Sequence, residues 1–179
     1  MTAARAPREI TPPFVTAGRV EAPARGARLT RALLRCGLAA GPVFAATTAV
    51  EGALRPDYRA LRHPVSSLAL GTRGWVQVAN FTVSGVLCAA FAAGLRRAAT
   101  PADPPAGPLL FGAAAGGLLL CGLFPADPVN GYPPGTPLTP DPVTPAGLAH
   151  LVASSAIMVG VPATTALYAR SALRAADRR

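Results

Sequence analysis

Hydrophobic residues occur along the chain in four long runs, and the segments between these runs hold nearly all of the charged residues. The runs predict helices over residues 33–52, 76–95, 107–124 and 146–169. A helix that crosses the hydrocarbon core of a bilayer needs about 20 residues, within a range of about 17–25. The second and fourth runs meet this length outright, whereas the first and third are short in their apolar part and rich in small residues. We therefore predict an all-α fold, a membrane helix bundle with four crossings.

A soluble four-helix bundle is the alternative, and it would need a polar face on each helix. The third run, LLFGAAAGGLLLCGLF (109–124), has no such face. Composition favours the membrane as well, because only 14% of the residues are charged and 51% are hydrophobic. Soluble domains carry about 25% charged residues. The three cysteines fall inside the apolar runs without metal-ligand spacing, which is typical of small buried residues.

The arginines are distributed unevenly, and their placement predicts an orientation. All 17 basic residues are arginine: seven occur up to Arg35, two in the connection at Arg96 and Arg97, and four from Arg170 onward. The opposite side of a four-crossing chain would hold only Arg55, Arg59, Arg62 and Arg73. By the positive-inside rule both termini lie in the cytoplasm. The segment FPADPVNGYPPGTP (124–137), which has no basic residue, then faces outward from a plasma membrane.

The net charge of +9 would also suit a nucleic-acid-binding protein. That class is not expected, because the arginines lie between apolar runs without interleaved aromatic residues. Residues 1–30 are rich in arginine, proline and alanine without a helical or strand period, so we expect a disordered cytoplasmic tail. Residues 31–170 form the transmembrane domain, and residues 171–179 a short basic cytoplasmic tail. A signal peptide ending near Ala45 is the competing interpretation, but the positive region before the first run is long for one.

Small and polar residues predict how the helices meet, because lipid supplies no hydrophobic drive for helix association. Gly112 and Gly116, like Ala113 and Gly117, are four residues apart and give the third helix a flat face. The second helix carries four polar or weakly polar residues on one stripe, which should turn inward: Gln77, Asn80, Ser84 and Cys88. The expected partners are membrane lipids and either a second copy of the chain or another membrane subunit.

Candidate chemistry gathers on the predicted outer side, at His63, Ser66, Asp127 and His150. These residue types suit a serine nucleophile with histidine and aspartate. They also suit a metal site in which His63, Asp127 and His150 hold a divalent ion such as zinc, although no cofactor is predicted. Neither option has motif-grade spacing. The alternative is a polar cap that orders two outer loops, in which Ser66 merely caps a short interfacial helix.

Three stretches together resemble a known family. The run EGALRPDYRALRHPVSSLALGTRGWVQVANF (51–81), the later FPADPVNGYPPGTP (124–137) and GLAH (147–150) are similar to an uncharacterised bacterial membrane family. This family is domain of unknown function 998, which is common in actinobacteria. The resemblance covers about residues 31–169 and implies a polytopic membrane protein without an established activity. The His-Pro-Val-Ser segment at 63–66 also has a fainter likeness to membrane hydrolases, by analogy only.

The chain departs from the family pattern in two respects. Relatives usually continue with about two more spans, and many carry a histidine where Ala146 stands. The second departure would leave a metal site short of a ligand, and the first suggests a shortened member that needs a partner chain. We therefore expect an uncharacterised multi-pass membrane protein that is structural or lipid-contacting. The alternative is a membrane-embedded hydrolase acting on a lipid or a lipid-linked substrate.

Overall fold

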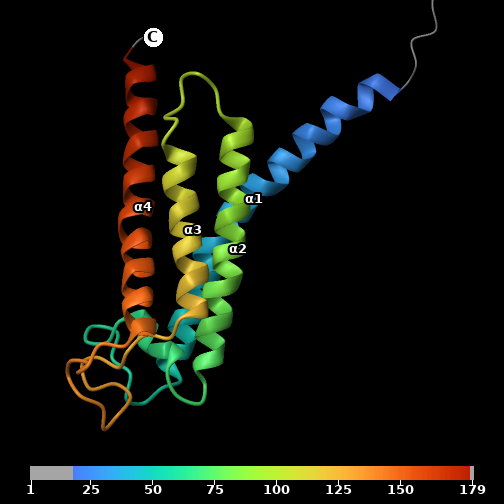
Figure 1. Ribbon diagram of the computed structural model, residues 1–179. Helices are drawn as coiled ribbons and strands as arrows, with labels where there is room; N and C mark the ends of the chain where they lie inside the picture. The colour runs from blue at the N-terminus through green and yellow to red at the C-terminus, as the bar shows by residue number, and fades with distance from the viewer. Residues whose placement is uncertain (1–17, 178–179) are drawn as a thin grey trace, which may run out of the picture.

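The part of the chain that the structure describes folds into four α-helices and one short 3₁₀ helix. The computed structural model describes residues 18–177 and, for side chains, residues 25–177. Along the chain the elements are α1 (Gly18–Ala53), η1 (Val65–Ala69), α2 (Gly74–Ala98), α3 (Gly107–Leu123) and α4 (Pro145–Ala176) (Figure 1). The described part contains no β-strand. The all-α prediction with four helices is confirmed.

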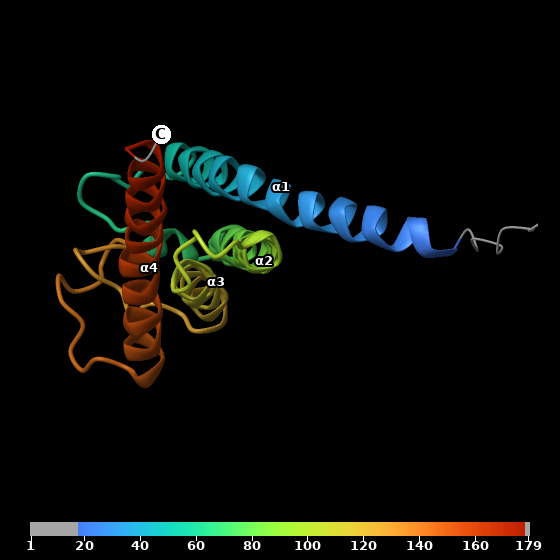
Figure 2. The same cartoon turned by 90° about the horizontal axis from the view of Figure 1, so that it is seen from above.

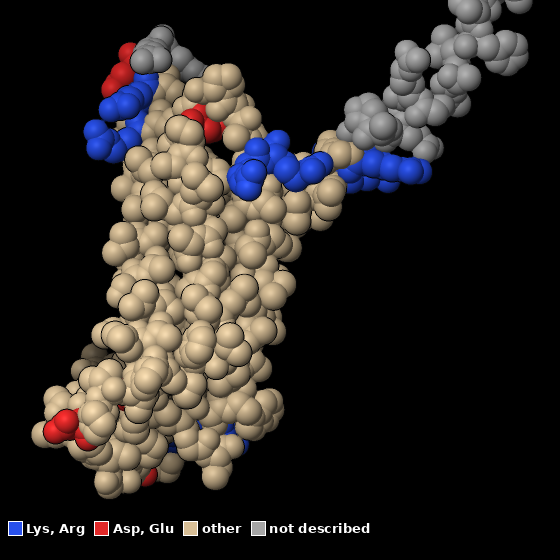
Figure 3. All heavy atoms as spheres, in the orientation of Figure 1, with Lys and Arg blue, Asp and Glu red and all other residues tan. Residues whose placement is uncertain are grey.

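Three of these helices are long and apolar enough to cross a membrane: α1 over Arg25–Ala53, α2 and α4. The fourth, α3, is apolar throughout but has 17 residues, or about 25 Å of length. In Figure 3 the visible face has a broad uncharged band between two ends where charged residues gather. Apolar helices arranged around such a band are typical of a membrane helix bundle.

The helices pack in sequence order, α1 on α2, α2 on α3 and α3 on α4. Figures 1 and 2 show that the N-terminal part of α1 extends away from the other helices. Consecutive elements of a fold commonly pack beside each other, and here they do so although only the 99–106 connection is short, whereas residues 54–73 and 124–144 form longer connections. The result is an open row of helices, in which α1 and α4 are the outer members.

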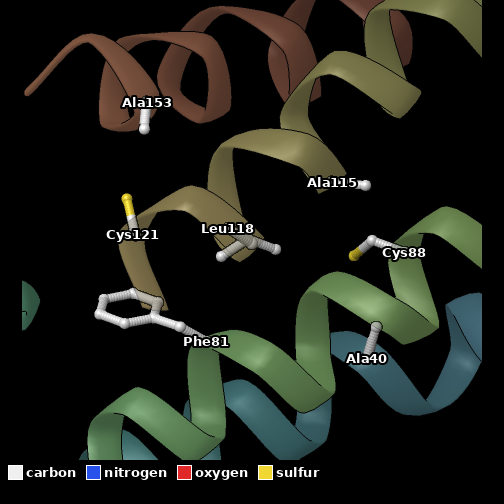
Figure 4. Packing of buried hydrophobic residues seen from close by; sticks show 7 residues of the cluster. All are labelled: Ala40, Phe81, Cys88, Ala115, Leu118, Cys121 and Ala153. Atoms are coloured by element: carbon white, nitrogen blue, oxygen red, sulfur yellow. The ribbon is translucent and has the colours of Figure 1, made fainter. Parts of the chain in front are cut away.

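Small side chains bring the helices close together. The buried core consists of Ala40, Phe81, Cys88, Ala115, Leu118, Cys121 and Ala153 (Figure 4). A Cβ atom added at Gly117 would lie 2.5 Å from the Ala153 carbonyl oxygen, and one added at Gly160 would lie 2.6 Å from that of Leu110. These glycines therefore allow α3 and α4 to approach backbone to backbone, as small residues do in membrane bundles.

The polar stripe of α2 faces the protein interior, as predicted. Gln77, Asn80, Ser84 and Cys88 are all buried. The Asn80 Nδ2 atom donates to the Phe44 carbonyl oxygen of α1 at 3.2 Å and lies 3.3 Å from Gln77 Oε1. Burial in this stripe removes polar groups from lipid, where an unpaired group is costly. The stripe thus joins α2 to α1.

Two helices extend beyond the ranges predicted for them from hydropathy. Helix α1 begins at Gly18, so residues 18–30 are helical where we expected a disordered tail; residues 1–17 lie outside the described residues. Helix α4 continues through Ala176, beyond the predicted end at residue 169. Alanine and arginine are both strong helix formers. Both helices can therefore continue past their apolar run, and hydropathy marks where that run ends, not where the helix does.

The connections lie at opposite ends of the bundle. The segments 54–73 and 124–144, which we call the cap, lie together at one end, and the 99–106 connection lies with the end of α4 at the other (Figure 1). Asn130 Nδ2 of the second cap segment donates to the Arg62 carbonyl oxygen of the first at 2.7 Å. Both predicted outer segments therefore lie at the same end of the bundle (Figure 1), as four crossings require, and they contact each other there.

Candidate functional site

Arg55 is the centre of the cap. Its guanidinium donates to the carbonyl oxygens of Leu70 at 2.8 Å and Leu68 at 2.9 Å, and to the Tyr132 hydroxyl at 3.2 Å. Its side chain is only 10% exposed. Hydrogen bonds from a charged donor are stronger than those between neutral groups. One arginine thus holds the turn after η1 and the second cap segment together.

Glu51, near the end of α1, is the counter-charge of this centre. It is 3% exposed and its carboxylate lies 2.6 Å from Arg73 Nη2 and 3.5 Å from Arg55 Nη2. A buried charge is tolerated only when it is paired. The hydrogen bond and the charge of Glu51 raise the pKa of Arg73. Two of the four cap arginines are therefore engaged with this carboxylate.

His63 lies in an aromatic cluster of the cap. Its Nδ1 atom accepts a hydrogen bond of 3.0 Å from the Arg59 backbone N–H. Its ring centroid lies 5.1 Å from that of Tyr132 and 5.8 Å from that of Tyr58. The Tyr58 hydroxyl donates to the His63 carbonyl oxygen at 3.2 Å. Burial, and to a lesser degree the neighbouring Tyr132, raise the pKa of Tyr58.

A small polar pocket adjoins His63. It has a volume of about 230 Å³ and carries two arginines, an aspartate and an asparagine. We call it the polar pocket; its lining residues are Pro56, Asp57, Arg59, Arg62, His63, Asn130, Gly131 and Pro134. Asn130 and Gly131 adopt positive φ angles of 56° and 75°. This left-handed turn, which favours glycine and asparagine, directs the second cap segment over the first.

His150 lies at the junction of α3 and α4. Its Nδ1 atom is 2.8 Å from the Phe124 carbonyl oxygen, which can only accept, so Nδ1 is the donor. Its Nε2 atom is buried and has no hydrogen-bond partner among the described residues. The ring meets that of Phe81 edge to face at 6.1 Å. A neutral histidine in this state offers one unused acceptor.

Asp127 anchors the start of α4. Its carboxylate accepts hydrogen bonds from Thr144 Oγ1 at 2.7 Å and from the Thr144 backbone N–H at 2.9 Å. Thr144 in turn caps the helix by accepting from the Gly147 N–H at 2.9 Å. The carboxylate lies directly against Gly147, where a Cβ atom would not fit. A negative charge here also suits the helix dipole.

Ser66 lines a larger, mostly apolar cavity, which we call the groove. The groove has a volume of about 680 Å³. All four helices and η1 contribute to it, through Gly37, Ala40, Gly41, Phe44, Pro64, Val65, Ser66, Phe81, Ser84, Cys88, Phe111, Leu118, Cys121, Ser154, Ile157, Met158 and Val161. Several of these form the core in Figure 4, whereas Gly41 and Met158 are exposed. Ser66 is the second residue of η1 and does not cap it, because Pro64 is the N-cap.

The four predicted site residues thus occupy one end of the bundle in three different settings. His63 lies at the polar pocket, Ser66 at the groove, and Asp127 with His150 at the start of α4. Within residues 18–177 neither histidine ring hydrogen-bonds to Asp127, and no three His, Cys, Asp or Glu side chains are grouped to hold a metal. Histidine Nδ1 atoms are held by backbone groups instead.

Sequence reasoning missed Arg55 and Tyr132, which join the two cap segments. One signal was available for Arg55. An arginine in a predicted outer segment runs against the positive-inside distribution, so it needs a local reason such as a buried acid. Glu51 lies four residues earlier, one helical turn away. Tyr132 carried no comparable signal, because its contact with Arg55 spans 77 residues.

Comparison with curated proteins and with solved structures produced no match. A family model described as a protein of unknown function (DUF998) matches residues 38–179. The match includes η1, α2, α3, α4 and most of the apolar part of α1. It therefore contains the whole cap and every predicted site residue. The chain belongs to DUF998, a family of proteins of unknown function.

Proposed function

We propose that this is a structural, lipid-contacting protein of the plasma membrane, with both termini cytoplasmic, and that its groove receives the hydrocarbon chain of a lipid. The observation that carries the proposal is the groove itself, an apolar cavity in a bundle with three helices long and apolar enough to cross a membrane. Its floor is buried core and its sides carry exposed residues of α1 and α4, such as Gly41 and Met158. A lipid chain can therefore enter from the side.

The size of the groove favours a flexible chain over a helix. Its volume of about 680 Å³ lies within the range of about 300–1,000 Å³ that is common for small-ligand cavities. A spanning helix of about 10 Å diameter and 30 Å length would fill roughly 2,400 Å³. Only the edge of such a helix would fit. A single hydrocarbon chain is thinner and can follow the groove. There it contacts apolar side chains, as it would contact other lipid chains in the bilayer.

The arginine distribution supports the proposed orientation. Arg96 and Arg97 lie at the end of α2, and Arg170 and Arg174 lie near the end of α4, so all four are at the end opposite the cap. Figure 3 shows positive charge gathered at that end, above the uncharged band. The cap arginines Arg55 and Arg73 are paired with Glu51. The excess of positive charge is therefore at the end opposite the cap, where the positive-inside rule expects the cytoplasm.

The hydrogen bonds of the cap favour a structural function over catalysis. Asp127 accepts two hydrogen bonds from Thr144, and His63 Nδ1 accepts one from a backbone N–H. Groups held this way stabilise loops and helix ends. A zinc site at His63, Asp127 and His150 has less support, because no three His, Cys, Asp or Glu side chains within residues 18–177 are grouped to hold a metal.

A membrane-embedded hydrolase is the second candidate, and one observation favours it. His150 Nε2 is a buried acceptor without a partner, which is the state that a general base needs. Ser66 and Ser154 line the nearby groove, where a lipid substrate would bind. In this version Ser66 is the nucleophile or a polar stabiliser, and His150 or His63 is the base.

Photo-crosslinking tests the lipid proposal. Full-length protein in vesicles is irradiated with diacylglycerol that carries a photoreactive group in its acyl chain, and the labelled residues are mapped by mass spectrometry. Wild type should be labelled at groove residues such as Met158 and Phe111. Gly41→Phe should lose this labelling, because Gly41 lines the groove and a side chain there points into open space. Gly26→Phe is the matched control on the same helix, since it also enters open space but lies outside the groove.

Equal labelling of Gly41→Phe and wild type would contradict the proposal. Crosslinks between two copies of the chain through the groove would contradict it as well. The hydrolase candidate is tested separately, by lipid turnover of wild type and of His150→Phe, which keeps an aromatic ring against Phe81. Equal turnover by both proteins would exclude His150 as the base.

A further inference from the structure

We infer that the polar pocket of the cap binds a phosphate-bearing group. The inference depends on the proposed lipid contact in one respect only, which is whether the phosphate belongs to a lipid headgroup. The pocket is lined by the side chains of two exposed arginines, Arg59 and Arg62, and by the buried His63. None of these groups is used by the interactions that hold the cap together through Arg55.

The two arginines are available for an anion. Among the described residues, the guanidinium groups of Arg59 and Arg62 form no ion pair and no hydrogen bond. Backbone atoms of the same residues fix the segment: the Arg59 N–H bonds to His63, and the Arg62 carbonyl oxygen to Asn130. The side chains therefore project from an ordered backbone. A guanidinium presents paired N–H donors that match phosphate oxygens.

His63 adds a further donor. Its Nδ1 atom accepts from the Arg59 N–H, so in the neutral ring the proton is on Nε2. Nε2 is thus the ring atom with which His63 can donate to a ligand in the polar pocket. Asp57 also lines the pocket and offsets one of the two positive charges. The pocket keeps one net positive charge, and its carboxylate can meet an ammonium group that accompanies a phosphate in a zwitterionic headgroup.

The charge distribution gives an independent reason for this site. Arginine is scarce on the predicted outer side, and there two of its four residues, Arg55 and Arg73, are used by Glu51. The other two, Arg59 and Arg62, line one pocket. Arg59 and Arg62 thus keep positive charge in an outer segment without a partner among the described residues. An external anion that binds them would explain why the charge is there.

The location connects the polar pocket to the groove. Arg62 and His63 line the pocket, and the next residues, Pro64 to Ser66, line the groove. Consecutive Cα atoms lie about 3.8 Å apart, so the two cavities adjoin along the chain. Trp75, 70% exposed, lies at the same end of the bundle, where aromatic residues mark the headgroup level. One amphiphile could place its phosphate in the pocket and its chain in the groove.

Binding of two probes tests the inference. Full-length protein in detergent is titrated with short-chain phosphatidic acid and, separately, with inorganic phosphate. Arg59→Gln/Arg62→Gln should weaken binding by at least about tenfold, because the variant loses both charged hydrogen-bond donors to the phosphate. Arg96→Gln/Arg97→Gln is the matched control, since it removes two arginines from the opposite end and should bind as wild type does. Thermal unfolding of each variant verifies the fold.

The two probes distinguish the sources of the phosphate. Binding of phosphatidic acid alone assigns the site to a lipid headgroup, and binding of both probes, lost in the double variant, assigns it to a phosphate group in general. Equal binding by wild type and the double variant, or binding of neither probe by wild type, would overturn the inference. Gly41→Phe should keep its affinity for inorganic phosphate, and the arginine variant should keep its groove labelling by diacylglycerol, which has no phosphate. Failure of the pocket and failure of the groove are thus separate results.

Discussion

The guanidinium of Arg55 donates a hydrogen bond to the hydroxyl of Tyr132 at 3.2 Å, across 77 residues of sequence. The same guanidinium also donates to the backbone carbonyl oxygens of Leu68 and Leu70, at the end of η1. One side chain therefore sets how the two connections of the cap lie against each other. The polar pocket lies between those connections and depends on this arrangement.

Arg55→Met should destabilise the protein strongly. The substitution leaves Glu51 buried with Arg73 as its one remaining cationic partner among residues 25–177. It also leaves the carbonyls of Leu68 and Leu70 without this donor. Removal of one partner of a buried ion pair costs about 3–5 kcal/mol. Denaturant unfolding in detergent measures the loss. Arg59→Met, at an exposed side chain, should change the free energy of unfolding by less than about 0.5 kcal/mol, and equal losses for both variants would contradict the role of Arg55.

Asn80→Ala should loosen the contact between α1 and α2. Asn80 donates to the Phe44 carbonyl oxygen and lies within a buried polar stripe. Hydrogen bonds between membrane helices contribute about 0.6 kcal/mol on average and up to about 1.7. We expect a loss near the upper value, measured by unfolding in detergent. Thr82→Ala is the control, because Thr82 bonds only to its own helix and is exposed; a loss as large as that of Asn80→Ala would argue against the stripe.

The neighbouring glycines of α3 should respond differently to leucine. Gly117→Leu would drive a side chain into the α4 backbone and should prevent folding, whereas a Cβ at Gly116 meets nothing within 4 Å. Gly116→Leu should therefore fold. If the predicted self-association uses the Gly112 and Gly116 face, this variant should be monomeric while wild type is not, as measured by light scattering in detergent. Unchanged association would exclude that face as the interface.

The proposed orientation predicts which cysteines react from outside the cell. In a background without native cysteines, a single cysteine at Asn130 should be labelled by a membrane-impermeant maleimide applied to intact cells. A cysteine at Arg97, at the opposite end of the bundle, should be labelled only after the membrane is permeabilised. The reverse pattern would invert the model of both termini in the cytoplasm.

The cap should lose stability at alkaline pH. Burial raises the pKa of Tyr58 above its ordinary value of about 10, with Tyr132 adding to the shift. Because the fold favours the neutral phenol, this contribution is complete below the ordinary pKa and is lost as the pH rises through the raised one. The unfolding temperature should therefore fall above about pH 10. Tyr58→Phe cannot ionise, so a fall of the same size in this variant would assign the effect to another group.

The sequence by itself determined the four helices, their membrane character and the inward face of α2. Hydropathy and a period of 3.6 residues are local properties, so Gln77, Asn80 and Ser84 could be placed on one stripe without knowledge of their partners. The family resemblance followed from sequence as well. Helix ends were less well determined, because alanine and arginine continue a helix beyond the apolar run that hydropathy detects.

Only the tertiary structure decided which residues of the cap meet. It gave His63, Asp127 and His150 different hydrogen-bond partners and gave Arg55 its partner Tyr132. It also distinguished Gly117, pressed against α4, from Gly116, which faces open space. These relationships depend on how two connections about 70 residues apart pack on the ends of four helices. Local sequence patterns do not tell how segments so far apart in the sequence pack together. The groove and the polar pocket could therefore be found only from the tertiary structure.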